Sequence, residues 1–164
     1  SREHLRLDQL PQRKGSRLRS LADIESAIEA AGANPDPGAG ANELLALSEE
    51  VLEHWVTAKG GVPTQDEREG FRLLALHRQG AKGDPSFNAC RETCREVAYH
   101  YNLLKLQPDA AEITDRLQMM MMVSNHLYLF ISGKMQIAQL GDFCCSSRPI
   151  RTGSEAGTLK IKEA

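Results

Sequence analysis

The stretch that most constrains the fold is residues 109–140, which contain the longest apolar run of the chain. It includes four consecutive methionines at positions 119–122. Asp109 and Glu112 follow Pro108 with the spacing of a helix N-terminal capping pair, so we expect a helix to begin at Asp109. Because its sequence is apolar on most sides, this helix should lie at the centre of the fold and be surrounded by its neighbours.

The second half of this stretch has two interpretations. Residues 127–140 are rich in aromatic and branched side chains around Ser132-Gly133-Lys134, which is compatible with a β-hairpin. A continuous helix would instead align six side chains on one face: Leu117, Met121, Ser124, Tyr128, Ile131 and Met135. We favour the helix because these six side chains form one continuous line that runs from the first half of the stretch into the second.

Four further helices are expected before this one. The first starts at Ser20 and ends at Gly32, and a Pro- and Gly-containing linker follows at residues 33–41. A second helix is predicted for residues 42–59. The capping box Thr64–Glu67 predicts the start of a third. The fourth is predicted for residues 86–106, with an apolar stripe at alternating steps of three and four.

Together these elements predict an all-α fold, a compact bundle of about five antiparallel helices joined by short connections. The chain has 164 residues, of which 41% are hydrophobic, enough to bury a core in one domain. We expect a basic N-terminal arm at residues 1–19, the bundle at residues 20–141 and a flexible C-terminal tail at residues 142–164.

The four cysteines do not have the spacing of a secreted disulfide framework. Cys90 and Cys94 lie one helical turn apart, while Cys144 and Cys145 are adjacent and are expected to be exposed and open to oxidation. This usage favours a reducing, cytoplasmic location. The longest apolar run is about half of the roughly 20 residues that cross a bilayer, so we expect no membrane span.

No catalytic or cofactor motif is present: the sequence contains no H-E-x-x-H, G-x-S-x-G, Walker loop or G-x-G-x-x-G. We therefore expect no cofactor and favour a protein that is not an enzyme. One alternative is a metal or redox site built from Cys90 and Cys94 with His100 or His126. The competing interpretation is that both cysteines are small hydrophobic residues of the core, since both fall on the stripe of the fourth helix.

The leading hypothesis is an interaction or regulatory domain that binds a protein partner, or a second copy in a homodimer, through an apolar helical face. A helix apolar all round has more apolar surface than four neighbours are expected to cover, and methionines suit adaptable contacts. The predicted partner-binding residues are Met119, Met120, Met122, His126, Tyr128 and Phe130.

A further alternative is a nucleic-acid-associated accessory protein. Its contacts would be made by the cations of the basic arm: Arg13, Lys14, Arg17 and Arg19. Such a cluster favours weak, salt-dependent binding to phosphates without sequence preference, and it lacks an aromatic residue for base stacking. In the third helix, Arg68, Arg72 and Arg78 form the nearest other basic group, next to three acidic residues.

Overall fold

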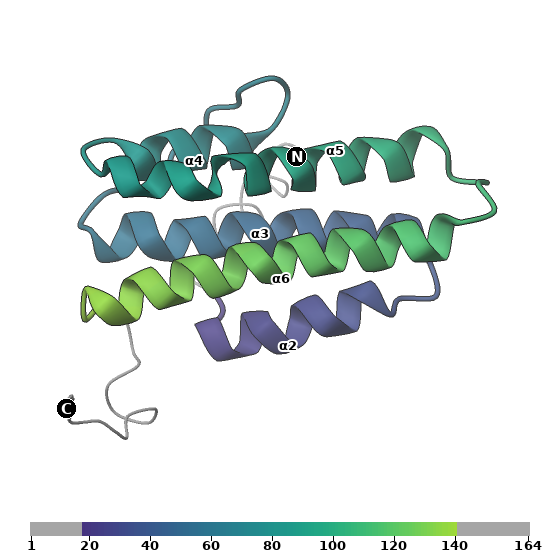
Figure 1. The fold of residues 1–164 in the computed structure, drawn as a ribbon, viewed down its shortest axis with the longest axis horizontal. Coiled ribbons are helices and arrows are strands. Elements are labelled where there is room, and N and C mark those ends of the chain that lie inside the picture. Colours follow the sequence, from purple (N-terminus) through teal and green to yellow (C-terminus); the bar gives the residue numbers. More distant parts are fainter. Residues whose placement is uncertain (1–17, 141–164) are drawn as a thin grey trace, which may run out of the picture.

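The computed structural model describes residues 18–140. Within this range the fold is an all-α bundle, as predicted, in which α3 and α6 run side by side through the middle (Figure 1). The shorter α2 packs on one side of this pair, and α4 and α5 lie on the other. The elements are α2 Leu21–Gly32, α3 Pro37–Ala58, α4 Arg72–Ala81, the 3-10 helix η1 Pro85–Cys90, α5 Arg91–Leu106 and α6 Ile113–Ile137.

The first helix has the predicted limits. Ser20 is its N-cap, and its hydroxyl accepts a hydrogen bond from the Asp23 amide at 3.1 Å. The helix ends at Gly32, where a Cβ would lie only 2.5 Å from Met121 Cγ of α6. Glycine therefore allows α2 to approach the methionine run closely.

The prediction of a linker over residues 33–41 is wrong in its second half, because α3 begins at Pro37. The Asp36 carboxylate caps this helix by accepting hydrogen bonds from the amides of Gly38 at 3.1 Å and Ala39 at 3.3 Å. Proline is favoured at the first helical position, where its missing N–H group costs no hydrogen bond. The dipeptide Asp36-Pro37 was thus a helix start, and the glycines after it are helical.

The predicted start of the third helix at Thr64 is also wrong, since α4 begins at Arg72. Thr64 accepts a hydrogen bond from the Asp66 amide at 3.0 Å and forms a local turn instead of a helix cap. Arg68 and Phe71 then exchange two backbone hydrogen bonds, of 3.0 and 2.9 Å, around Glu69 and Gly70, which both have positive φ. This tight antiparallel turn ends the loop directly before α4.

The last two helices differ from the predictions at their starts. The predicted fourth helix divides into η1 and α5 at Cys90, and α6 begins at Ile113, not at Asp109. From there α6 continues without a break to Ile137, so the hairpin alternative for residues 127–140 is excluded. None of the helices within residues 18–140 has the length and apolarity needed to cross a membrane.

The core lies between α3 and α6 and is closed by α2, α4, η1 and α5. Ser48 of α3 and Ser124 of α6 are fully buried and hydrogen-bond to each other at 3.2 Å, which satisfies two hydroxyls inside this apolar layer. Near the C-terminal end of α6, Lys134 lies over the Trp55 ring at 5.0 Å and 3.5 Å from the Asp84 carboxylate. These contacts join α6 to α3 and to the start of η1.

We predict opposite effects on stability for two glycine-to-alanine changes in helices. A Cβ at Gly40 would lie 2.7 Å from the Ala31 carbonyl oxygen and 3.0 Å from Leu117 Cδ2, so Gly40→Ala should lower the free energy of unfolding by about 1–3 kcal/mol. At Gly133 no heavy atom lies within 4 Å of the new Cβ, so Gly133→Ala should raise it by about 0.5–1 kcal/mol. Urea unfolding measures both values, and equal effects of the two changes would contradict this packing.

Candidate functional site

Helix α6 has a buried face and an exposed face. The buried side chains face the bundle: Leu117, Met120, Ser124, Leu127, Tyr128, Ile131 and Met135. On the opposite face, Met119 is 51% exposed, Met122 60%, Leu129 55% and Ile137 87%. The expectation that neighbours would surround this helix is therefore wrong for one side, which is left uncovered among the described residues.

The structure divides the six predicted partner-binding residues between these two faces. Met119, Met122 and His126 lie on the exposed face. Met120 and Tyr128 are buried in the core and are not available to a partner, and Phe130 is partly buried against the core. Sequence analysis missed Leu129 and Ile137, although their spacing from Met122 places them on its side of the helix.

We refer to Met119, Met122, His126, Leu129 and Ile137 as the outer stripe. Up to Leu129 its members follow each other in steps of three, four and three residues, and Gly133 continues the pattern four residues later. This spacing is that of a helix–helix contact seam. Residues 117–133 contain no Asp, Glu, Lys or Arg, so the stripe is both exposed and without formal charge over most of its length.

A second surface feature is a hollow of about 170 Å³ between α4, η1 and the start of α5, which we call the arginine groove. Its lining is Arg68, Leu74, His77, Arg78, Ala81, Asn88, Arg91 and Arg95. It therefore contains four guanidinium groups and no carboxylate. Arg95 pairs with Glu69 at 2.7 Å, whereas Arg68, Arg78 and Arg91 form no ion pair with any residue in the range 18–140.

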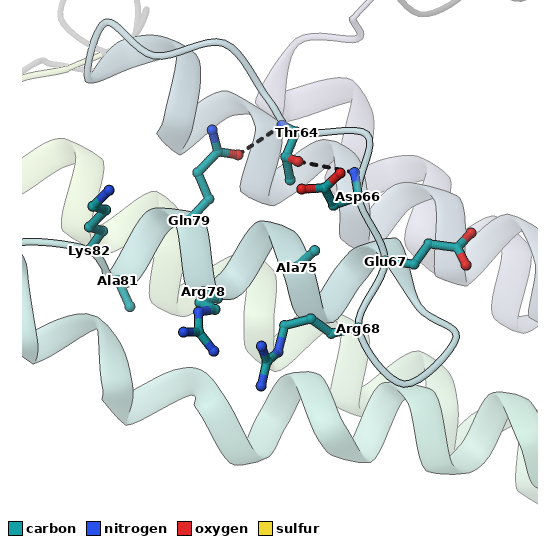
Figure 2. A pocket seen from close by; sticks show the side chains of 9 residues that line it. All are labelled: Thr64, Asp66, Glu67, Arg68, Ala75, Arg78, Gln79, Ala81 and Lys82. Carbon is teal, nitrogen blue, oxygen red and sulfur yellow. Dashed lines mark hydrogen bonds between the residues drawn. The ribbon is translucent and has the colours of Figure 1, made fainter.

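A larger cleft of about 910 Å³ adjoins the arginine groove and shares Arg68, Arg78 and Ala81 with it. Figure 2 shows the guanidinium groups of Arg68 and Arg78 directed toward the same space, while Gln79 points to the other side of α4. The Glu67 carboxylate is directed away from both arginines (Figure 2). The cleft thus continues the groove past the side chains of α4.

The loop before α4 is held in place by two side chains of that helix. Gln79 accepts a hydrogen bond from the Thr64 amide at 2.9 Å and donates one to the Val62 carbonyl at 2.8 Å. Arg72, only 9% exposed, donates to the Thr64 carbonyl at 2.8 Å and pairs with Glu49 and Glu53 of α3. These contacts fix the loop that carries Arg68, and they explain why the Thr64 region is not helical.

Cys90 and Cys94 are buried and unpaired by disulfides, which confirms their prediction as core residues. The nearby imidazole is that of His77, whose Nε2 donates to the Phe87 carbonyl at 3.0 Å, and not that of the exposed His126. A hydrogen bond from the Cys94 thiol lowers the pKa of Cys90 to about 6 and, with His77, outweighs the effect of burial. Within residues 18–140, no group of three or more His, Cys, Asp or Glu side chains is arranged to hold a metal ion.

Three of the four predicted nucleic-acid contacts of the arm, Arg13, Lys14 and Arg17, lie outside the described residues. The pair Cys144-Cys145 also lies outside them. Arg19 is described, and it is held on the bundle. Its guanidinium bonds to the Glu50 carboxylate at 2.8 and 3.2 Å and to Glu43 at 3.3 Å. Arg19 therefore joins the start of the bundle to α3.

Comparisons of the chain with protein-family models, with curated proteins and with solved structures gave no significant match.

The Arg72 contacts give a stability prediction. Arg72→Gln would leave the Glu53 carboxylate, whose side chain is only 11% exposed, without its ion-pair partner, so the free energy of unfolding should fall by about 2–4 kcal/mol. Arg95→Gln is the matched control, because its ion pair with Glu69 is more exposed and should contribute less than about 1 kcal/mol. Denaturant unfolding of both variants tests this, and equal losses would contradict it.

Proposed function

We propose that this chain is a non-enzymatic interaction or regulatory domain whose outer stripe on α6 binds a second copy of the same chain. The observation that carries the proposal is the uneven burial of α6. Its inner face is part of the core, whereas four large apolar side chains of its outer face are more than half exposed. Apolar side chains gathered on one exposed face are a feature of protein-binding surfaces.

The absence of charge along the stripe favours a second copy as the occupant. Two identical surfaces meet without like-charge repulsion only where they carry no net charge, and residues 117–133 contain no ionisable side chain except His126 and Tyr128. Tyr128 is buried within its own chain. No lysine or arginine on the stripe would have to lose its water on association, so burial of this face carries no desolvation penalty from those charges.

The side-chain sizes along the stripe also suit an antiparallel pair related by a two-fold axis. Met119 and Gly133 lie seven residues on either side of His126, so an axis near His126 would bring Met119 of each copy opposite Gly133 of the other. Space is open around the Cα of Gly133, which would receive the methionine side chain. A side chain of one helix that inserts into a space on the other, as Met119 would at Gly133, is the knobs-into-holes packing of paired helices.

Dimerisation is tested by charge substitutions on the stripe. Met122→Glu and Leu129→Glu would place an unpaired carboxylate in the contact, so each should weaken self-association by more than about tenfold. Leu106→Glu is the matched control, because Leu106 is an equally apolar side chain, 79% exposed, at the end of α5. Sedimentation equilibrium of the full chain over a wide concentration range measures the dissociation constants.

The proposal expects a dimer for the unchanged chain and for the Leu106→Glu variant, and a monomer for the two stripe variants with unaltered helical circular dichroism. A chain that remains monomeric at the highest concentration measured would overturn self-association. Equal weakening by all three substitutions would instead place the contact elsewhere.

A further inference from the structure

The arginine groove lies outside the proposed contact between two copies. It is a second surface feature of the chain, in which clustered positive charges lack a matching number of negative charges. Four guanidinium groups from three separate segments line it: Arg68 from the loop, Arg78 from α4, and Arg91 and Arg95 from α5. Cations brought together in this way repel each other unless an anion lies between them. The Glu69 carboxylate bonds to Arg95. Asp66 and Glu67 line the adjoining cleft, but among residues 18–140 they form no ion pair with Arg68, Arg78 or Arg91.

The groove is shaped by the fold and does not depend on flexible side chains alone. Its floor consists of Leu74, His77 and Ala81 of α4, of which Leu74 and His77 are buried. His77 is fixed by its hydrogen bond to the Phe87 carbonyl and by stacking on the Phe87 ring, with centroids 5.3 Å apart. The two-bond turn between Arg68 and Phe71 fixes the backbone that carries Arg68.

We infer that the arginine groove binds the phosphoryl group of a phosphomonoester. The groove holds three guanidinium groups without an ion-pair partner and a fourth beside them. A phosphomonoester dianion, with two charges and three terminal oxygens, matches this set better than a carboxylate, which has one charge and two oxygens. Each guanidinium presents planar pairs of N–H donors that fit phosphate oxygens.

The adjoining cleft accommodates the organic part of such a ligand. It is continuous with the groove through Arg68, Arg78 and Ala81. The rest of its lining combines the polar or cationic side chains of Thr64, Gln79 and Lys82 with Ala75 and the carboxylates of Asp66 and Glu67. A phosphorylated side chain of a protein and a free mononucleotide share the phosphoryl chemistry and differ in what they would place in this cleft. This inference does not depend on dimerisation, because its residues lie outside the outer stripe.

The experiment is a nuclear magnetic resonance titration of the full chain with inorganic phosphate, against sodium chloride at matched ionic strength. Saturable shifts of the arginine Nε–H signals and of the backbone around α4 and the start of α5 are expected. The double variant Arg78→Gln/Arg91→Gln should weaken binding at least about tenfold, since two charge-assisted contacts are lost. Both side chains are exposed, so the fold should persist, as circular dichroism would verify.

Arg116→Gln is the control for charge removal away from the groove, because it removes one positive charge at the start of α6, at the opposite end of the bundle (Figure 1). It should leave phosphate binding unchanged. Titrations with a phosphoserine peptide and with adenosine monophosphate, each against its unphosphorylated form, then identify the source of the phosphoryl group. Tighter binding of either than of inorganic phosphate supports the inference and shows that the cleft is occupied.

Three results would overturn it. The first is the absence of saturable binding by phosphate and by both phosphomonoesters. The second is a loss of phosphate binding in the Arg116→Gln variant as large as that in the double variant. The third is binding of duplex DNA without any binding of the monoesters, which would make these arginines part of a surface for a nucleic-acid backbone.

Discussion

The fold depends on the burial of one face of α6 against α3. The apolar layer between these two long helices includes Leu117, Met120, Leu127 and Ile131, all nearly or fully inaccessible, with the Ser48–Ser124 hydrogen bond inside it. Helices α2 and α5 pack on this same pair, and Gly40 brings α3 to within van der Waals contact of Leu117. Because the bundle covers only one side of α6, the structure that stabilises the domain also leaves the outer stripe exposed.

Apolar periodicity was sufficient to predict the class of fold, the helical nature of residues 127–137 and the core positions of Cys90 and Cys94. Helix starts were harder, because a cap signal does not show which alternative bonds compete with it. Thr64–Glu67 has the spacing of a capping box, yet Arg72 and Gln79 bind the backbone of this loop and hold it in a non-helical conformation. Asp36-Pro37 was taken as part of a linker because glycines follow it, although aspartate before proline is itself a helix start.

The candidate surfaces were only partly predictable. Met119, Met122 and His126 were identified from the apolar sequence around the methionine run, but the sequence did not show which side of α6 faces the core, so Met120 and Tyr128 were included as well. The arginine groove combines residues up to 27 positions apart, from Arg68 to Arg95, and it depends on a tight turn at Glu69-Gly70. The basic group that includes Arg68 and Arg78 was visible in the sequence, as was the i, i+4 spacing of Arg91 and Arg95. Neither local pattern reveals that the loop and the two helices face one another.

The central claim is that the methionines of α6 lie in two different environments. Met120 is buried in the core, whereas Met119 and Met122 form a contact between two copies of the chain. Methionine methyl resonances recorded with a paramagnetic relaxation agent test it most directly, because the sequence contains only five methionines. We predict that Met120 and Met135 are protected at every protein concentration, and that Met119 and Met122 are accessible in dilute samples and become protected as the concentration rises. Accessibility of Met119 and Met122 that does not change with concentration would contradict the proposed contact, and an accessible Met120 would contradict the packing of α6 itself.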